Sequence, residues 1–224
     1  MIQNILVLVL FNTLTFMAKD WTGNTNSIFK THGASNHSSV RREENDFYAS
    51  PPCAVRTLLD YCINNGIDIT NKPILEPCCG KGHISEVCKQ YGFTVDSRDL
   101  INRGYGERFE NFLENQETNI DKHIITNPPY KYAKEFVEHS IGMLNEGNYI
   151  CMLLKLTFLE GTKRQTMFKK NPPYKVLVFS DRINCSLGGD FENDSEYNGA
   201  VCYAWFIWKV GYNDLTTIDW INAK

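Results

Sequence analysis

The sequence lacks several patterns that would assign a protein directly to a ligand class. Its 224 residues contain no C-x-x-C pair, no G-x-x-x-x-G-K-S/T phosphate loop and no complete G-x-G-x-x-G fingerprint. The absent phosphate loop and the incomplete fingerprint argue against a nucleoside triphosphate or a dinucleotide. The absent Cys pairs argue against a zinc site. No internal repeat is present either, so a single large domain is expected for this length.

The chain also lacks a large net charge. Lys and Arg total 23 against 26 Asp and Glu, which leaves a formal net charge of −3. These totals argue against a protein coated in positive potential, but they are compatible with a local basic patch. Hydrophobic residues make up 42% of the chain, a fraction that predicts a globular protein with a core.

The cysteines predict a chain without disulfides. Most of them lie in apolar or helical stretches, and none is spaced as a metal-binding pair. We interpret them as free thiols in a reducing compartment, the cytoplasm. They are Cys53, Cys62, Cys78, Cys79, Cys88, Cys151, Cys185 and Cys202.

Apolar residues dominate positions 2–16, but this run is too short to span a bilayer comfortably. No Lys or Arg occurs within it, so the positive start of a signal peptide is missing. We interpret residues 1–16 as an upstream extension ahead of a natural start at Met17, with an apolar membrane-associating leader as the alternative. Residues 17–46 are polar and predict an irregular arm. Residues 47–224 predict the folded domain, for which no membrane contact is expected.

Helical periodicity begins after two adjacent prolines. Apolar side chains recur at helical spacing between Ala54 and Ile63. Ser50 is the predicted N-cap of this helix because its hydroxyl can accept a backbone hydrogen bond. Pro51 suits the first turn, where its missing N–H is not needed.

A strand, a glycine loop, a helix and a second strand follow in order. Residues 72–76 and 93–96 predict the two strands, and Gly80 and Gly82 lie in the loop after the first. Asp99 lies close to the end of the second strand. This order predicts a Rossmann-like, doubly wound α/β sheet.

The rest of the chain continues the alternation of strands and helices. Strands are predicted at 123–126, 149–154, 175–179 and 201–208, with helices from about residue 131 and at 163–170. The segment 201–208 is apolar on both faces, so it should lie inside the sheet. We predict a mostly parallel sheet with an antiparallel C-terminal hairpin strand, in which 201–208 is the last strand.

Acidic residues beside the glycine loop point to a cationic ligand. Glu76 ends the first strand, and Asp99 is spaced from it to hold ribose hydroxyls. Gly80 and Gly82 allow a ligand to approach the backbone closely, but Ser85 stands at the third glycine position of the fingerprint. Two carboxylates without a phosphate cradle suit a cationic nucleoside such as S-adenosylmethionine. A structural turn with a surface acid is the alternative.

The tetrapeptide Asn127-Pro128-Pro129-Tyr130 follows a short apolar strand, so we expect it at the ligand-binding edge of the sheet. Asn127 offers a carboxamide oxygen as acceptor, and Pro128 has a carbonyl but no N–H. Two adjacent acceptors suit an NH2 group on a planar ring or amide, and they make its nitrogen lone pair more available. Tyr130 offers a face for stacking. A Pro-rich turn without chemistry is the alternative.

A second Asn-Pro-Pro-Tyr occupies residues 171–174. A basic helix precedes it instead of a strand, so Asn171 is not expected at the carboxyl end of a strand. We interpret this copy as a turn that leads into the next strand.

These motifs resemble the class I S-adenosylmethionine-dependent methyltransferases that act on amino groups, and in particular the DNA adenine-N6 methyltransferases of phages and prophages. The resemblance rests on the loop 76–82 and the tetrapeptide 127–130. Residues 46–52 and 154–161 support it. It extends over residues 21–208.

The resemblance implies S-adenosylmethionine as the cofactor and gives its contacts residue by residue. The glycine loop would surround the methionine part, Asp99 would bind the ribose, and Tyr48 and Ser50 would close the pocket. Phe112 would stack on the cofactor adenine, but Asn111 stands where the family usually has an acidic residue. The loop residues concerned are Glu76, Pro77, Cys78, Gly80 and Gly82.

The resemblance also implies direct methyl transfer to an adenine of DNA that has left the duplex. Asn127 and the Pro128 carbonyl would accept the two amino hydrogens, while Tyr130 would stack on the base. Pro129 completes the catalytic tetrapeptide. Neither a metal nor a covalent enzyme intermediate is implied.

Other acceptors and one non-catalytic function stay open. Proteins that methylate a glutamine amide also use Asn-Pro-Pro-Tyr, and RNA or the N4 atom of cytosine are further candidates. The departure at Asn111 leaves room for a DNA-binding module that has lost catalysis. Contacts with DNA are expected from Arg41, Arg42, the helix 163–170 and the loop 185–200.

Overall fold

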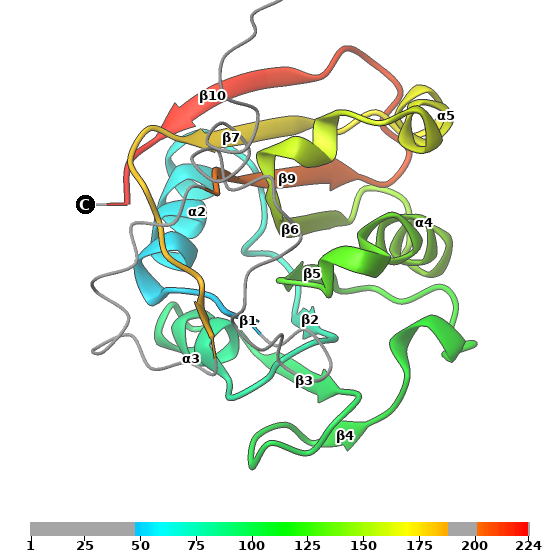
Figure 1. Cartoon of the computed structure of the whole chain (residues 1–224). Helices are drawn as coiled ribbons and strands as arrows, with labels where there is room; N and C mark the ends of the chain where they lie inside the picture. The colour runs from blue at the N-terminus through cyan, green and yellow to red at the C-terminus, as the bar shows by residue number, and fades with distance from the viewer. Residues whose placement is uncertain (1–47, 188–200, 224) are drawn as a thin grey trace, which may run out of the picture. The chain divides into compact units, whose positions relative to one another are not determined.

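A central sheet organises the described part of the chain, residues 48–187 and 201–223 of a computed structural model (Figure 1). Its strands are β2 (Ile74–Glu76), β3 (Val95–Asp99), β4 (Arg108–Phe109), β5 (His123–Thr126), β6 (Tyr149–Lys155), β7 (Lys175–Phe179), β9 (Tyr203–Lys209) and β10 (Thr217–Ile221). A separate antiparallel pair consists of β1 (Tyr48–Ala49) and β8 (Ser186–Leu187).

The strands of the central sheet lie in the order β10-β7-β9-β6-β5-β2-β3-β4. β9 is antiparallel to both of its neighbours, and the other neighbouring pairs are parallel. The predicted α/β class, with a mostly parallel sheet and an antiparallel strand near the C-terminus, is confirmed. The prediction that 201–208 is the last strand is wrong, because β10 adds a parallel strand beside β7.

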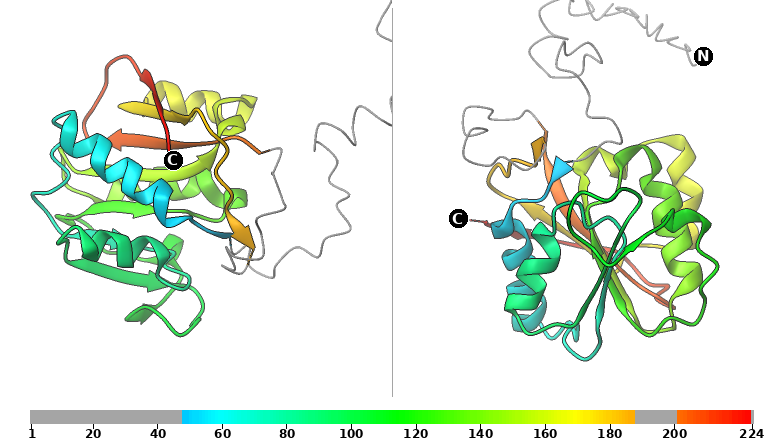
Figure 2. Two further views of the ribbon diagram at one scale, coloured as in Figure 1. Left: turned by 90° about the vertical axis from the view of Figure 1, so that its left-hand side faces the viewer. Right: turned by 90° about the horizontal axis from the view of Figure 1, so that it is seen from below.

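Helices cover both faces of the sheet (Figure 2). The helices α2 (Pro52–Asn64) and α3 (His83–Gln90) lie on one face, and α4 (Ala133–Met143) and α5 (Thr162–Lys170) lie on the other. Short 3-10 helices follow β4, β5 and β6. They are η1 (Phe112–Glu114), η2 (Tyr130–Tyr132) and η3 (Leu156–Leu159).

Burial on both faces explains the almost unbroken apolar sequences of β6 and β9. Successive side chains of a strand point to opposite faces. On β9, Trp205 and Ile207 pack in the cluster that contains α2 and α3, whereas Phe206 and Trp208 pack with α4 and α5. The predicted position of this segment inside the sheet is confirmed.

Two local predictions are wrong. Pro51 is the N-cap of α2, and the Ser50 hydroxyl makes no capping hydrogen bond. β3 covers Val95–Asp99 instead of 93–96, so Asp99 is the last residue of a strand. Asp99 is therefore held by the strand itself, and the Ser50 hydroxyl is not used to cap the helix.

The cysteines are free thiols, as predicted. None of the helices in the described ranges is long and apolar enough to cross a membrane. The segments 1–16 and 17–46, for which an extension and an arm are predicted, lie outside the described residues.

A buried histidine links two strands at the opposite, amino-terminal edge of the sheet. His123 begins β5 and is 1% exposed. Its Nδ1 accepts a hydrogen bond from the Tyr149 N–H at 2.9 Å, so Nε2 carries the proton and donates to the Asn71 side-chain oxygen at 3.0 Å. Burial, aided by the nearby Lys72 ammonium, lowers the pKa of His123 to about 4. The ring is therefore neutral at physiological pH.

The free energy of unfolding should fall in acid because of His123. An unfolded chain protonates this ring below its ordinary pKa of 6.5, whereas the folded chain resists protonation until about pH 4. The contribution of His123 is therefore full above the ordinary value and is lost as the pH falls to the folded value, by up to roughly 3 kcal/mol. Urea unfolding of the wild type and His123→Asn over this range measures the effect. Asn keeps an acceptor for the Tyr149 N–H.

The wild type should be more stable than His123→Asn near neutral pH, and this difference should shrink as the pH falls. Other titrating groups cancel in the difference. A difference that stays the same at every pH would contradict a neutral, buried His123.

Candidate active site

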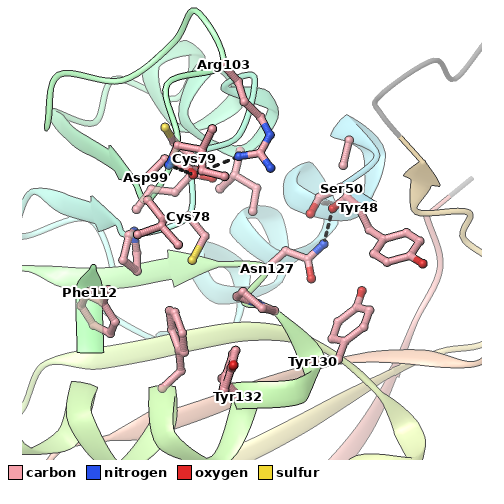
Figure 3. A pocket seen from close by; sticks show the side chains of 18 of the residues that line it. Tyr48, Ser50, Cys78, Cys79, Asp99, Arg103, Phe112, Asn127, Tyr130 and Tyr132 are labelled. Atoms are coloured by element: carbon pink, nitrogen blue, oxygen red, sulfur yellow. Dashed lines mark hydrogen bonds and ion pairs between the residues drawn. The ribbon is translucent and has the colours of Figure 1, made fainter. Parts of the chain in front are cut away.

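The carboxyl ends of β2, β3, β5 and β6 surround a cavity of about 910 Å³ (Figure 3). Open α/β sheets commonly bind ligands at this edge. One half of the cavity lies beside β2 and β3 and is acidic. The other half lies beside β5 and β6 and contains an asparagine, tyrosines and a lysine. The predicted site residues that line the cavity are Tyr48, Ser50, Glu76, Pro77, Cys78, Asp99, Asn111, Phe112, Asn127, Pro129 and Tyr130.

Glu76, the last residue of β2, is 1% exposed and belongs to the acidic half. The Ser85 hydroxyl donates a hydrogen bond to its carboxylate, and the hydroxyl oxygens of Ser85 and Ser97 lie 2.6 Å apart. Burial raises the pKa of Glu76 to about 8, and the Asp99 carboxylate adds to the rise. A cation beside Glu76 would favour its ionised form.

Asp99 is held by three donors. Its Oδ2 accepts a hydrogen bond from the Gly80 N–H at 2.7 Å, and its Oδ1 accepts one from the Ile101 N–H at 2.9 Å. Arg103 forms an ion pair with the same Oδ1 at 3.1 Å (Figure 3). A ribose bound as predicted would have to share Asp99 with Arg103 or displace the guanidinium.

Gly82 has a backbone conformation that favours glycine. Its φ is +87°, and a Cβ at this position would lie 2.5 Å from the Tyr105 ring. The Tyr105 hydroxyl accepts a hydrogen bond from Lys89 and donates one to Glu86, which anchors the ring on α3. Neither Gly80 nor Gly82 lines the cavity. The loop therefore shapes the site through its backbone path.

Two adjacent thiols lie on the cavity wall. Burial raises the pKa of Cys78 well above its ordinary value and the pKa of Cys79 to about 12. Both are thus protonated at neutral pH. They offer soft apolar surface and are poor nucleophiles.

Phe112 and Asn111 form another part of the wall. The Phe112 ring stacks on Phe136 of α4 with centroids 5.0 Å apart. Asn111 caps η1, because its Oδ1 accepts a hydrogen bond from the Leu113 N–H at 3.2 Å. Its Nδ2 donates to Glu114 at 2.8 Å. The second lone pair of the Asn111 oxygen has no assigned use in this cap, so the predicted contact with an adenine amino group stays a prediction.

Asn127 follows β5, and the segment before α2 fixes its orientation. Its Nδ2 donates a hydrogen bond to the Tyr48 carbonyl oxygen at 2.8 Å (Figure 3). Its Oδ1 is then buried without a hydrogen-bond partner among residues 48–187 and 201–223. Buried polar atoms are almost always paired, so an orphaned acceptor needs an explanation. A donor brought by a ligand would provide it.

Aromatic rings surround this asparagine. The Tyr48 and Tyr130 rings are stacked, with centroids 6.1 Å apart and planes inclined by 22°. Tyr203 of β9 tilts against Tyr130 with centroids 6.1 Å apart. Lys155 at the end of β6 places its Nζ 4.9 Å from the Tyr130 centroid. Tyr48, predicted to close the cofactor pocket, thus lies beside the predicted amine-holding tetrapeptide.

Pro128 is buried and is not among the lining residues. Its predicted role uses only the backbone carbonyl, and it stays a prediction, as do the roles of the lining residues. Arg41, Arg42 and the segment 188–200, from which DNA contacts are expected, lie outside the described residues. The basic helix is present as α5.

Several lining residues were missed by reasoning from the sequence. Lys155 could have been predicted to lie at the site, because it directly follows the predicted strand 149–154. Arg103 lies in an irregular segment whose sequence does not indicate a position in the fold. The lining residues not predicted are Ala49, Cys79, His83, Ile84, Leu100, Ile101, Arg103, Glu110, Leu113, Lys131, Tyr132, Phe136 and Lys155.

No protein-family model and no curated protein sequence matches the chain. Solved structures match it in fold. A proposed class I S-adenosylmethionine-dependent methyltransferase from Listeria monocytogenes aligns with a TM-score of 0.55 and 13% identity, over 87% of this chain and 70% of its own. A proposed RNA methyltransferase from Pyrococcus horikoshii aligns with a TM-score of 0.56 and 12% identity, over 83% and 97%. The M protein of the type I restriction enzyme EcoKI gives 0.51 and 16%, over 74% and 44%.

Glu76 should make the ligand-free protein less stable as the pH rises. Its folded pKa of about 8 exceeds the ordinary 4.5, so its contribution is full below the ordinary value and is lost as the pH rises through the folded one. The loss is roughly 1.4 kcal/mol per pH unit between these values. Glu76→Gln removes the titration and should become increasingly more stable than the wild type toward pH 8.

Urea unfolding of the ligand-free proteins at several pH values measures this effect. The exposed Glu107 offers a matched control, because Glu107→Gln makes the same replacement at a solvated site. This control should follow the wild type. A pH-independent offset between Glu76→Gln and the wild type would contradict a protonated Glu76.

Proposed function

The chain has the class I methyltransferase fold, and from it we propose that the protein transfers a methyl group from S-adenosylmethionine to the N6 amino group of adenine in DNA. The observation that carries this proposal is the buried Asn127 Oδ1, which lacks a hydrogen-bond partner among the described residues. An acceptor kept in that state fits a donor supplied by the substrate. An exocyclic amino group is such a donor.

The acidic half of the cavity fits the cofactor that the fold implies. Glu76 and Asp99 suit a cationic nucleoside, and Phe112 offers an aromatic face. The Ser50 hydroxyl is a further buried polar atom without a partner in the described ranges. A volume of about 910 Å³ is near the upper end of ordinary ligand pockets, which leaves room for a nucleoside and a base. When bound, S-adenosylmethionine supplies an electrophilic methyl group.

The other half of the cavity fits the amino group. The Tyr48 carbonyl occupies the donor side of the Asn127 carboxamide, so the oxygen side is held ready for the substrate. Asn127 Oδ1 and the Pro128 carbonyl accept the two amino hydrogens and direct the nitrogen lone pair. The rings of Tyr48 and Tyr130 give the extruded base an aromatic surface. Positioning of this kind can supply a large share of a rate enhancement.

DNA as the acceptor is supported by the sequence resemblance, and one structural neighbour, the EcoKI M protein, belongs to a restriction enzyme. A glutamine amide in a protein and an adenine in RNA present the same NH2 group. The neighbour from Pyrococcus horikoshii is itself a proposed RNA methyltransferase. The retained Asn127 acceptor argues against a binding module without catalysis.

Asn127→Ala should reduce methyl transfer by roughly 10²- to 10³-fold, the usual effect of losing one positioned hydrogen bond in a transition state. Cofactor affinity should change little, because Glu76, Asp99 and Phe112 belong to the other half of the cavity. Transfer of tritium from labelled S-adenosylmethionine to unmethylated DNA measures the first effect, and titration calorimetry measures the second. Mass spectrometry of the digested DNA identifies N6-methyladenine.

Asn171→Ala is the matched control, since it alters the other Asn-Pro-Pro-Tyr and should keep substantial activity. The same assay with RNA or with a glutamine-containing peptide separates the acceptors. Label found only in RNA or peptide would refute DNA as the substrate. Loss of cofactor binding in Asn127→Ala would refute the role given to this residue.

A further inference from the structure

Lys155 brings a positive charge into the part of the cavity that is proposed to receive the base. It ends β6 and lines the cavity together with Asn127 and Tyr130. Its backbone partner across the sheet is Tyr203 of β9. With its Nζ 4.9 Å from the Tyr130 ring centroid, the ammonium contacts the ring on which the base is proposed to stack.

This ammonium is separated from the acids of the cavity. The ion pairs among the described residues do not include Lys155. Glu76 and Asp99 end β2 and β3, and β5 and β2 lie between β3 and β6 in the sheet. Glu110, which also lines the cavity, is paired with Arg98. Lys155 is half-buried, and the Tyr130 ring offers it only a modest cation–π attraction.

The ligand chemistry that complements such a cation is an anion. A neutral adenine base and a glutamine side chain both carry an amino group but no negative charge. A nucleotide carries a phosphate. The carboxylate of the cofactor is a second source of negative charge, so an experiment has to separate it from the phosphate.

We propose that Lys155 binds a phosphate of the nucleotide whose base enters the cavity, and thereby favours nucleic acid over a protein amide as the acceptor. This inference rests on the proposed function and identifies a residue that selects its substrate class. Without a phosphate the ammonium lies over the Tyr130 ring. With a phosphate bound, it would leave the ring and contact the phosphate. A phosphate held in this way fixes the register of the nucleotide, while the Asn127 oxygen holds its amino group.

Lys155→Gln removes the charge and keeps a side chain of similar length. The slope of log affinity against log salt concentration is negative, and loss of one phosphate contact should reduce its magnitude by about 0.7 to 0.9. DNA affinity at about 0.1 M salt should therefore fall roughly five- to eightfold. Fluorescence anisotropy with an adenine-containing duplex, in the presence of S-adenosylhomocysteine to prevent turnover, measures both quantities. Calorimetric affinity for S-adenosylmethionine should not change.

Lys209 provides a matched control. Its Nζ also lies over a tyrosine ring, 5.4 Å from the Tyr149 centroid, and its backbone pairs with Tyr149 at the start of β6. It therefore lies at the opposite edge of the sheet from the cavity. Lys209→Gln should keep the wild-type slope and affinity. Lys155→Arg retains the charge and should restore most of the slope that Lys155→Gln loses.

The smallest acceptor fragments give a second measurement. Deoxyadenosine 5′-monophosphate should compete with DNA for the wild type more strongly than deoxyadenosine does. Lys155→Gln should abolish this preference, whereas Lys209→Gln should retain it. This comparison isolates the phosphate, because the base and the sugar are the same in both competitors.

Other outcomes would overturn the inference. An unchanged salt slope with reduced turnover would mean that Lys155 acts only by packing on Tyr130. Weaker cofactor binding with an unchanged DNA slope would assign the lysine to the cofactor carboxylate. In both cases the wild type would still methylate DNA, so the proposed function would stand. A wild type that methylates only a peptide amide would refute both proposals.

Discussion

The parallel direction of β2, β3, β5 and β6 is the constraint on which the cavity depends. Because their carboxyl ends lie at one edge of the sheet, Glu76, Asp99, Asn127 and Lys155 come together from distant parts of the chain. β9 runs in the opposite direction, so its first residue, Tyr203, reaches the same edge. The helices that bury both faces of the sheet leave this edge as the place where polar side chains can meet a ligand.

A single hydrogen bond then gives the asparagine its direction. A carboxamide presents a donor on one side and an acceptor on the other, and rotation about its last bond exchanges them. The Tyr48 carbonyl accepts from Asn127 Nδ2, which commits the donor side and leaves Oδ1 without a partner among the described residues, as the proposed contact with an amino group requires. Tyr48 is itself positioned by the short pairing of β1 with β8. A segment that precedes α2 thus orients the side chain of a residue that follows β5.

Sequence patterns predicted the strands that are apolar and buried on both faces. They missed an exposed edge strand and the end of a strand that contains a buried charge. A nearly continuous apolar sequence was sufficient to predict β6 and β9. β10 is a short edge strand. Its sequence alternates from Thr217 to Trp220, but the apolar Ile218 and Trp220 are exposed, so the alternation does not mark a buried face. The predicted strand ended at residue 96, before Arg98. This charged residue is nevertheless only 3% exposed, because Asp96 and two glutamates beyond β4 neutralise it. The bond from Asn127 to a backbone carbonyl leaves no trace in residue identity.

Strand direction places the two Asn-Pro-Pro-Tyr copies at opposite edges of the sheet. Asn127 follows a strand of the parallel set, whereas Asn171 is the C-cap of α5 and precedes β7. β6 and β7 are both antiparallel to β9, so they run in the same direction, and the chain before β7 lies at the amino edge. Tyr174 accordingly packs against Tyr149, the first residue of β6, with ring centroids 6.1 Å apart. The same four residues therefore support a turn at one edge and a candidate amine site at the other.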